Sequence, residues 1–117
     1  MTSPTDLNEI ELCGKKYRCK ASFAALVMIE QKAGSSILKI FERYSQHDVR
    51  AIDVAAILYG CMRGADDNLP LSFEDVGEIV YEHGVGALQL PAFMLVKDAF
   101  TGPKKKVDAI LEKPPKE

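Results

Sequence analysis

The chain has 117 residues, of which 47% are hydrophobic and 27% charged, and its formal net charge is −2. This balance predicts one globular domain with a core of its own, and it disfavours a general nucleic-acid binder, whose domain is normally basic. The longest apolar run, residues 23–29, is far below the roughly 20 residues that span a bilayer, and the N-terminal segment lacks the pattern of a secretory signal. We therefore expect a cytoplasmic protein with no membrane partner.

Residues 1–7 are expected to be a flexible leader, and the alternating pattern of residues 8–20 predicts a β-hairpin. A two-residue turn at Gly14-Lys15 would set the cross-strand pairs Leu12–Tyr17, Glu11–Arg18 and Ile10–Cys19. One face of the hairpin is then apolar and the other carries an opposite-charge pair. Such a hairpin is marginal alone and must dock on the rest of the domain.

The first two predicted helices are bounded by serine residues at their starts and by a glycine between them. Ser22 is a candidate N-cap for a helix over residues 23–33, with residues 23–29 buried, and Gly34 suits a left-handed C-terminal position. Ser35 or Ser36 then caps a second helix. Its apolar stripe is Ile37, Ile40, Phe41 and Tyr44, at i, i+3, i+4 and i+7.

Three more helices are predicted downstream. Asp48 is a candidate cap for a helix that ends near Gly64. The broad apolar face of this helix consists of Val49, Ile52, Ala55, Ala56, Tyr59 and Met62. Ser72 and Asp75 form a near capping box for a fourth helix that ends at Gly84, with the stripe Phe73, Val76, Ile79 and Val80. A last helix is started or kinked by Pro91 and faces inward with Ala92, Leu95, Val96 and Ala99.

The predicted fold class is therefore mainly α (α+β), with a small N-terminal β-hairpin followed by a compact bundle of about five helices. Residues 8–101 form one domain, and residues 102–117 form a lysine- and proline-rich tail. The tail holds a small apolar cluster, Val107, Ile110 and Leu111, which is enough for a short amphipathic helix. That cluster could fold back on its own domain, dock on a neighbouring copy, or dock on a partner.

The residues that carry most enzyme chemistry are few and scattered. Cys13, Cys19 and Cys61 have no CxxC spacing, so we interpret them as core or surface thiols in a reducing compartment rather than as metal ligands. His47 is expected to have a local turn or capping role, and His83 to act as a cation in the last turn of a helix. The sequence has no nucleophile–base or phosphate-loop motif. We predict no enzyme activity, no cofactor and no metal site.

The order of elements and several residues within them carry a family resemblance. The first helix contributes Phe23, Ala25, Leu26, Glu30, Gly34 and Ser35, and the later Leu-Ser segment and helix contribute Leu71, Ser72, Gly77 and Gly84. Over about residues 8–100 the chain resembles the gene transfer agent and phage tail proteins classed with phage tail assembly chaperones, often described as phage tail tube proteins. The tail matches no pattern of that family.

The resemblance implies a non-enzymatic tail morphogenesis protein, in the cytoplasm of a bacterium that carries a prophage or gene transfer agent, or in the particle itself. As a tail assembly chaperone it would bind the tape-measure protein, with other tail proteins and self-association as further partners. That role needs exposed apolar surface. Our candidates for it are the leftover side chains Phe93, Met94, Phe100, Val107, Ile110 and Leu111, although Phe93 and Phe100 could instead complete the core beneath the hairpin.

Two alternatives remain open from the sequence. The first is a structural tail or head–tail component that oligomerises in the particle. The second and weaker one is a small nucleic-acid-binding regulator that uses residues 104–106, three consecutive lysines, to contact phosphates. Because these lysines are not interleaved with aromatic residues, a solvated tail is the favoured interpretation and nucleic acid an unfavoured partner.

Overall fold

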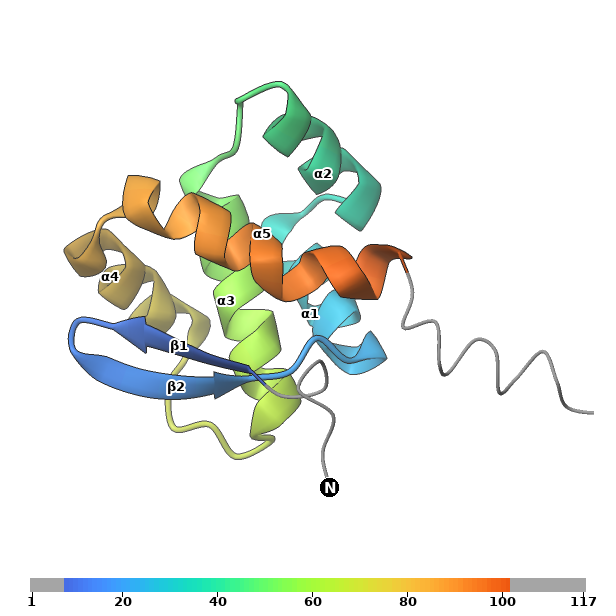
Figure 1. Ribbon diagram of the computed structural model, residues 1–117. Coiled ribbons are helices and arrows are strands. Elements are labelled where there is room, and N and C mark those ends of the chain that lie inside the picture. Colours follow the sequence, from blue (N-terminus) through green and yellow to red (C-terminus); the bar gives the residue numbers. More distant parts are fainter. Residues whose placement is uncertain (1–7, 102–117) are drawn as a thin grey trace, which may run out of the picture.

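The computed structural model describes residues 8–101, without the side chains of residues 100 and 101. Figure 1 shows an N-terminal hairpin and five helices. In chain order the elements are β1 (Asn8–Leu12), β2 (Lys15–Cys19), α1 (Phe23–Ala33), α2 (Ile37–Ser45), α3 (Ala51–Ala65), α4 (Phe73–His83) and α5 (Val85–Thr101). The predicted fold class is confirmed. None of the helices described is both long and apolar enough to cross a membrane. The predicted leader (1–7) and tail (102–117) lie outside the described residues.

The predicted hairpin forms, but its predicted register is wrong. The turn is Cys13-Gly14, and both residues have positive φ (54° and 81°), as a type I′ turn requires. The pairs are therefore Leu12–Lys15, Glu11–Lys16, Ile10–Tyr17, Glu9–Arg18 and Asn8–Cys19. Because the pairing shifts by two residues, an even number, the apolar side chains still share the face that packs on the helices, and Glu9–Arg18 and Glu11–Lys16 form opposite-charge pairs.

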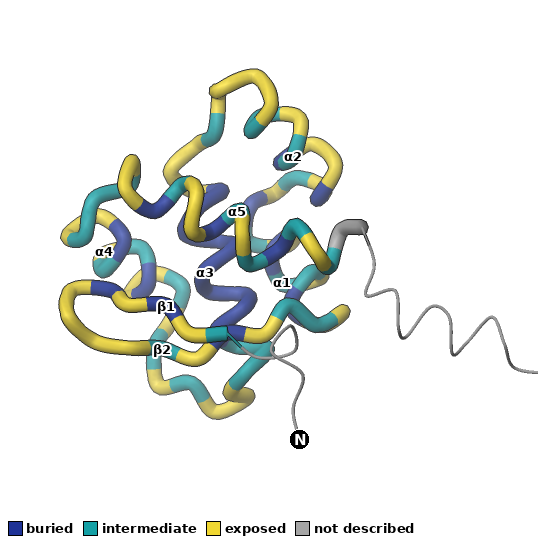
Figure 2. The backbone as a smooth tube through the Cα atoms, in the orientation of Figure 1, coloured by how far each residue is buried: buried dark blue, intermediate teal, exposed yellow. Residues whose placement is uncertain are grey.

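Helix α3 is the centre of the fold, and the other elements surround it (Figure 2). Its residues 53–62 are all buried, so it is enclosed on every side, whereas Ile52, predicted inward, is largely exposed. The predicted cap at Asp48 is wrong. The backbone N–H of Asp48 donates to the Arg43 carbonyl at 2.8 Å and so closes α2, and the N-cap of α3 is Arg50.

The predicted caps of α1 and α2 are present. The Ser22 hydroxyl accepts from the Ala25 N–H at 3.2 Å, Gly34 is left-handed (φ 66°), and Ser36 caps α2. The prediction that residues 23–29 are all buried is wrong. A helix turns 100° per residue, so only the side of α1 that meets α3 is buried, with Ala25 and Ile29, while Phe23 and Val27 face outward.

The last two helices follow each other directly. Ser72 and Asp75 form the predicted capping box of α4, and Gly84 (φ 110°) ends it before α5 begins. Pro91 lies inside α5 and is exposed. Ala92 and Val96 are buried against the core, as predicted, which leaves the opposite side of α5 facing outward across the front of the molecule (Figure 1).

Candidate functional site

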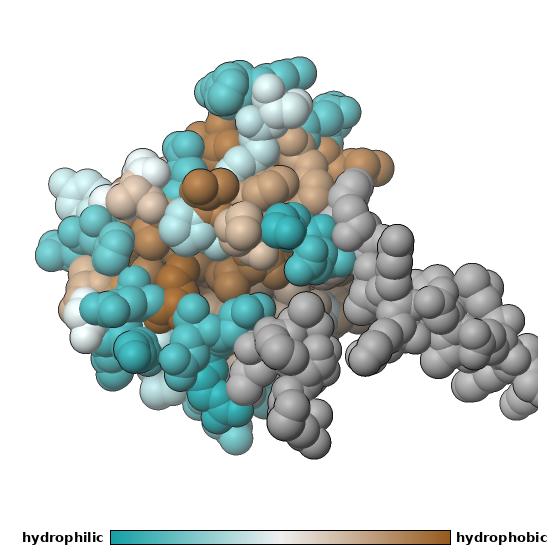
Figure 3. All heavy atoms as spheres, viewed as in Figure 1, coloured by the Kyte–Doolittle hydropathy of each residue, from teal (hydrophilic) through white to brown (hydrophobic). Residues whose placement is uncertain are grey.

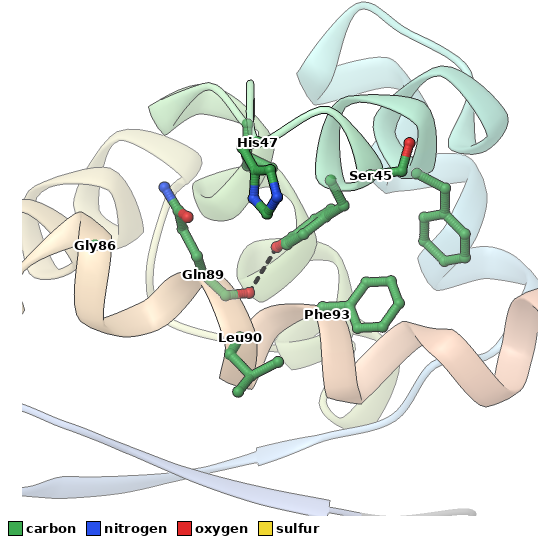
Figure 4. A pocket seen from close by; sticks show the side chains of 9 residues that line it. Ser45, His47, Gly86, Gln89, Leu90 and Phe93 are labelled. Carbon is green, nitrogen blue, oxygen red and sulfur yellow. Dashed lines mark hydrogen bonds between the residues drawn. The ribbon is translucent and has the colours of Figure 1, made fainter.

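A groove between α2 and α5 opens on the surface of the domain. We call it the α2/α5 groove; its volume is about 580 Å³. Figure 4 shows its walls, which come from α2, the loop before α3, and α5. The lining residues are Phe41, Tyr44, Ser45, His47, Val49, Gly86, Gln89, Leu90 and Phe93. The groove is therefore largely apolar, with a few polar groups at its rim.

Three aromatic rings connect the two walls of the groove. The ring centroid of Phe93 lies 5.3 Å from that of Phe41 and 5.0 Å from that of Tyr44, distances typical of favourable aromatic pairs. The Tyr44 hydroxyl donates to the Gln89 carbonyl at 2.7 Å, drawn as a dashed line in Figure 4. Burial and the nearby negative charge of Asp53 both raise the pKa of Tyr44, so its hydroxyl keeps the proton it donates.

Exposed apolar side chains continue from this groove along α5. Leu90 is 66% exposed and Met94 is 53% exposed, and the two stand four residues apart on one helical face. Apolar side chains, in brown, gather over α5 in Figure 3, between polar regions on either side. The outward face of α5 thus offers an apolar surface beside a preformed groove.

Two of the predicted contact residues lie at the groove, and the side chains of the others belong to the part of the chain that the structure does not describe. Phe93 lines the groove and contacts α2, and Met94 is exposed beside it. The Phe100 side chain, Val107, Ile110 and Leu111 lie outside the described residues, as do the lysines at 104–106. Sequence reasoning missed Leu90, although Leu90, Phe93 and Met94 fall at i, i+3 and i+4 and so form a second apolar stripe on α5.

His47, at the rim of the groove, ends α2. Its φ is 56°, and its backbone N–H donates to the Tyr44 carbonyl at 3.2 Å while that of Asp48 reaches Arg43. This is the Schellman arrangement, usually built on glycine. The predicted local capping role of His47 is confirmed. Its left-handed backbone turns the chain at the wall of the groove that His47 lines.

Asp53 fixes α2 to the rest of the fold, and sequence reasoning missed it. Its side chain is completely buried at the start of α3. It accepts two hydrogen bonds from the Arg43 guanidinium, at 2.7 and 2.8 Å, and others from the side chain and backbone N–H of Arg50. Arg50 also donates to the Ala33 carbonyl at 2.9 Å. The cluster therefore joins the end of α1, the last turn of α2 and the start of α3, and it holds one wall of the groove.

We predict that acid weakens the fold through Asp53. Burial alone would raise the pKa of its carboxyl, but hydrogen bonds from Arg43 and Arg50 outweigh it and lower the pKa from 3.8 to about 2. A carboxyl with a lowered pKa stabilises the fold above its unfolded pKa, and this contribution is lost as the pH falls from about 4 to about 2. The loss is about 2 kcal/mol. Urea unfolding across this pH range measures it, and a variant without the carboxylate is expected to lack this component.

His83 and the cysteines lie at structural positions. The backbone N–H of Cys13 donates to the His83 Nδ1 at 3.0 Å, so His83, in the last turn of α4, also contacts the hairpin turn. Its expected role as a cation at the end of the helix stays a prediction. Burial raises the pKa of Cys19 to about 12 and also raises that of Cys61, while Cys13 is exposed in the turn; all three thiols are free. Within residues 8–101, no three His, Cys, Asp or Glu side chains gather as metal ligands would.

Comparison with protein families identifies the family of this chain. Residues 8–102 match the family described as "Phage tail tube protein, GTA-gp10", which covers every element of the fold. No curated protein and no solved structure matches the chain. The resemblance inferred from the first helix and the later Leu-Ser segment is confirmed. With most of its length matched, the chain belongs to this family of phage and gene-transfer-agent tail proteins.

Proposed function

We propose that this protein is a non-enzymatic tail assembly chaperone that binds the tape-measure protein through the α2/α5 groove. The observation that carries the proposal is the pairing of that groove with the exposed Leu90 and Met94. A monomeric soluble protein rarely leaves a contiguous apolar surface beside a hollow unless something binds there. In a tail protein, the partner is expected to be another tail component.

The groove suits an amphipathic helix as its ligand. Such a helix inserts side chains at i, i+3 and i+4 into an apolar groove and keeps its polar face in water. Phe93 and its aromatic neighbours supply a rigid floor, and the flexible thioether of Met94 adapts to different side chains. A chaperone for a long repetitive partner needs this combination, because it meets many related segments rather than one. Phe100, Val107, Ile110 and Leu111 remain proposed contacts.

The test is binding of the purified protein to the tape-measure protein from the same particle. Leu90→Glu and Met94→Glu are expected to weaken binding by about 30-fold or more, because each places a carboxylate in an apolar contact whose loss is worth about 2 kcal/mol. Ile52→Glu is the matched control, since Ile52 is an aliphatic side chain that is 41% exposed and lines neither this groove nor the hollow at the start of α2. Equal loss in all three variants would remove the groove from the proposal, and no binding by the unaltered protein would remove the chaperone role.

A structural tail component is the second candidate, and the hairpin favours it. In the described part of the chain the sheet has only two strands, so each strand has one edge without a strand partner. An open edge is a template for pairing with another copy. Mass spectrometry of purified particles separates the candidates: the chaperone is expected to be absent, and stoichiometric presence would favour the structural component.

A further inference from the structure

A second hollow lies at the start of α2, where α1, α2 and the end of α5 meet, whereas the α2/α5 groove is lined by the end of α2. We call it the α1/α2 groove, and its volume is about 310 Å³. Its apolar lining comes from Phe23, Leu26, Val27, Ile37, Leu38 and Ala99. Phe23 is 82% exposed and Leu38 is 62% exposed, so two large apolar side chains stand in water at its rim. These are the outward side chains of α1 and α2 that the domain's own core does not use.

The chain itself leads from this groove into its C-terminal segment. Ala99 lines the groove and Thr101 is the last residue of α5, so the remaining residues begin at the groove's rim. Figure 1 shows the end of α5 reaching the region of α1 and α2. The next residues are Gly102 and Pro103, which disfavour continuation of the helix in the same direction. Helix propensity alone therefore does not direct the following sequence away from the groove.

The C-terminal segment carries one apolar cluster, and its spacing fits such a groove. Val107, Ile110 and Leu111 stand at i, i+3 and i+4 and would form one face of a single helical turn. Five residues (102–106) separate Thr101 from Val107, and the six Cα–Cα steps reach up to about 20 Å when extended. The cluster therefore lies within reach of the groove at whose rim the segment begins.

We propose that residues 107–111 dock in the α1/α2 groove of the same chain and cover Phe23 and Leu38. A cluster this small binds weakly as a separate peptide, because a helix of one or two turns is not stable alone. A short linker gives it an effective concentration in the millimolar range, which favours the groove of its own chain over that of a second copy. The inference concerns the isolated protein and does not depend on the tape-measure partner.

The sequence has no tryptophan, so the fluorescence of a single introduced tryptophan reports on the C-terminal segment alone. In the full-length Leu111→Trp variant, docking is expected to shift tryptophan emission to shorter wavelength and to protect the ring from acrylamide, relative to the same tryptophan in a free peptide of residues 102–117. Adding Leu38→Glu is expected to return the emission to that of the free peptide. Adding Leu90→Glu, the same change at a similarly exposed leucine in the other groove, is expected to leave the shift intact.

Three outcomes would overturn the proposal. Emission equal to that of the free peptide means that the segment does not dock. A shift that grows with protein concentration assigns the segment to a second copy. A shift removed by Leu90→Glu but kept with Leu38→Glu assigns it to the α2/α5 groove.

A second measurement keeps the native groove and avoids the bulk of tryptophan. The full-length triple variant Val107→Glu, Ile110→Glu and Leu111→Glu is expected to bind more of a dye that fluoresces on apolar surface than the unaltered protein does. The variant has fewer apolar side chains, so an increase in a variant whose urea midpoint is unchanged reports an uncovered surface rather than partial unfolding. Unchanged or lower dye fluorescence would contradict docking.

Discussion

Replacing Asp53 by asparagine is expected to destabilise the protein by about 3–5 kcal/mol, the usual cost of removing one partner from a buried ion pair. The amide has nearly the same volume, so the loss is electrostatic. Arg43, whose side chain is 17% exposed, keeps its charge and loses two short hydrogen bonds to a carboxylate. The new NH₂ group also faces guanidinium donors and has nothing to donate to. For a domain with total stability of about 5–15 kcal/mol, this is a large fraction.

Urea unfolding at neutral pH measures the loss, with Asp67→Asn as the matched control. Asp67 lies exposed in the loop between α3 and α4, so the same chemical change there is expected to cost less than about 0.5 kcal/mol. The difference between Asp53→Asn and the unaltered protein is expected to shrink as the pH falls from about 4 towards 2, because the carboxyl becomes protonated first in the unfolded state and then, around its folded-state pKa of about 2, in the folded state. A loss below about 1 kcal/mol at neutral pH would mean that the aromatic contacts, not the Asp53 cluster, hold α2.

The elements that the sequence predicted well are those fixed by their own neighbours. Ser22, Gly34 and the Ser72–Asp75 box act within one helical turn, so their roles can be read from four or five consecutive residues. The hairpin register was missed because Gly14 is the second residue of the turn, not the first, and Cys13 adopts the positive φ of the first position. Burial of α1 was overestimated because an apolar sequence does not say which side meets α3.

The site shows the same division between local and distant information. Phe93 and Met94 were identified because they did not fit the inward stripe of α5, a pattern visible within one helix. Asp53 was missed because an acidic residue in a first helical turn already has a sufficient explanation in the helix dipole. Its pairing with Arg43, ten residues earlier, depends on how α2 folds back over α3, and no spacing within one element indicates it.

Gly60 carries the closest contact between α1 and α3, and its replacement by alanine is expected to destabilise the protein by about 2 kcal/mol or more. A Cβ at this position would lie 2.9 Å from the Ala25 carbonyl oxygen and 2.5 Å from Cγ1 of the buried Ile29. The carbonyl belongs to the backbone of α1, so α1 would have to move away from α3. This cost exceeds the gain of about 1 kcal/mol that alanine brings to a helix interior.

Gly77→Ala is the control, because Gly77 lies inside α4 and a Cβ there would have no atom within 4 Å. It is expected to stabilise the protein by up to about 1 kcal/mol, so the same substitution in two helices gives opposite signs. Gly64→Ala is expected to resemble Gly60→Ala, since its Cβ would meet the Lys20 carbonyl, where the chain leaves the hairpin. The midpoint of urea unfolding, compared at an unchanged m-value, measures the stability of all three variants. A stabilised Gly60→Ala protein would mean that α1 can move away from α3 at little cost. Helix α1, which forms one wall of the α1/α2 groove, would then be less rigid than the packing of Ala25 and Ile29 indicates.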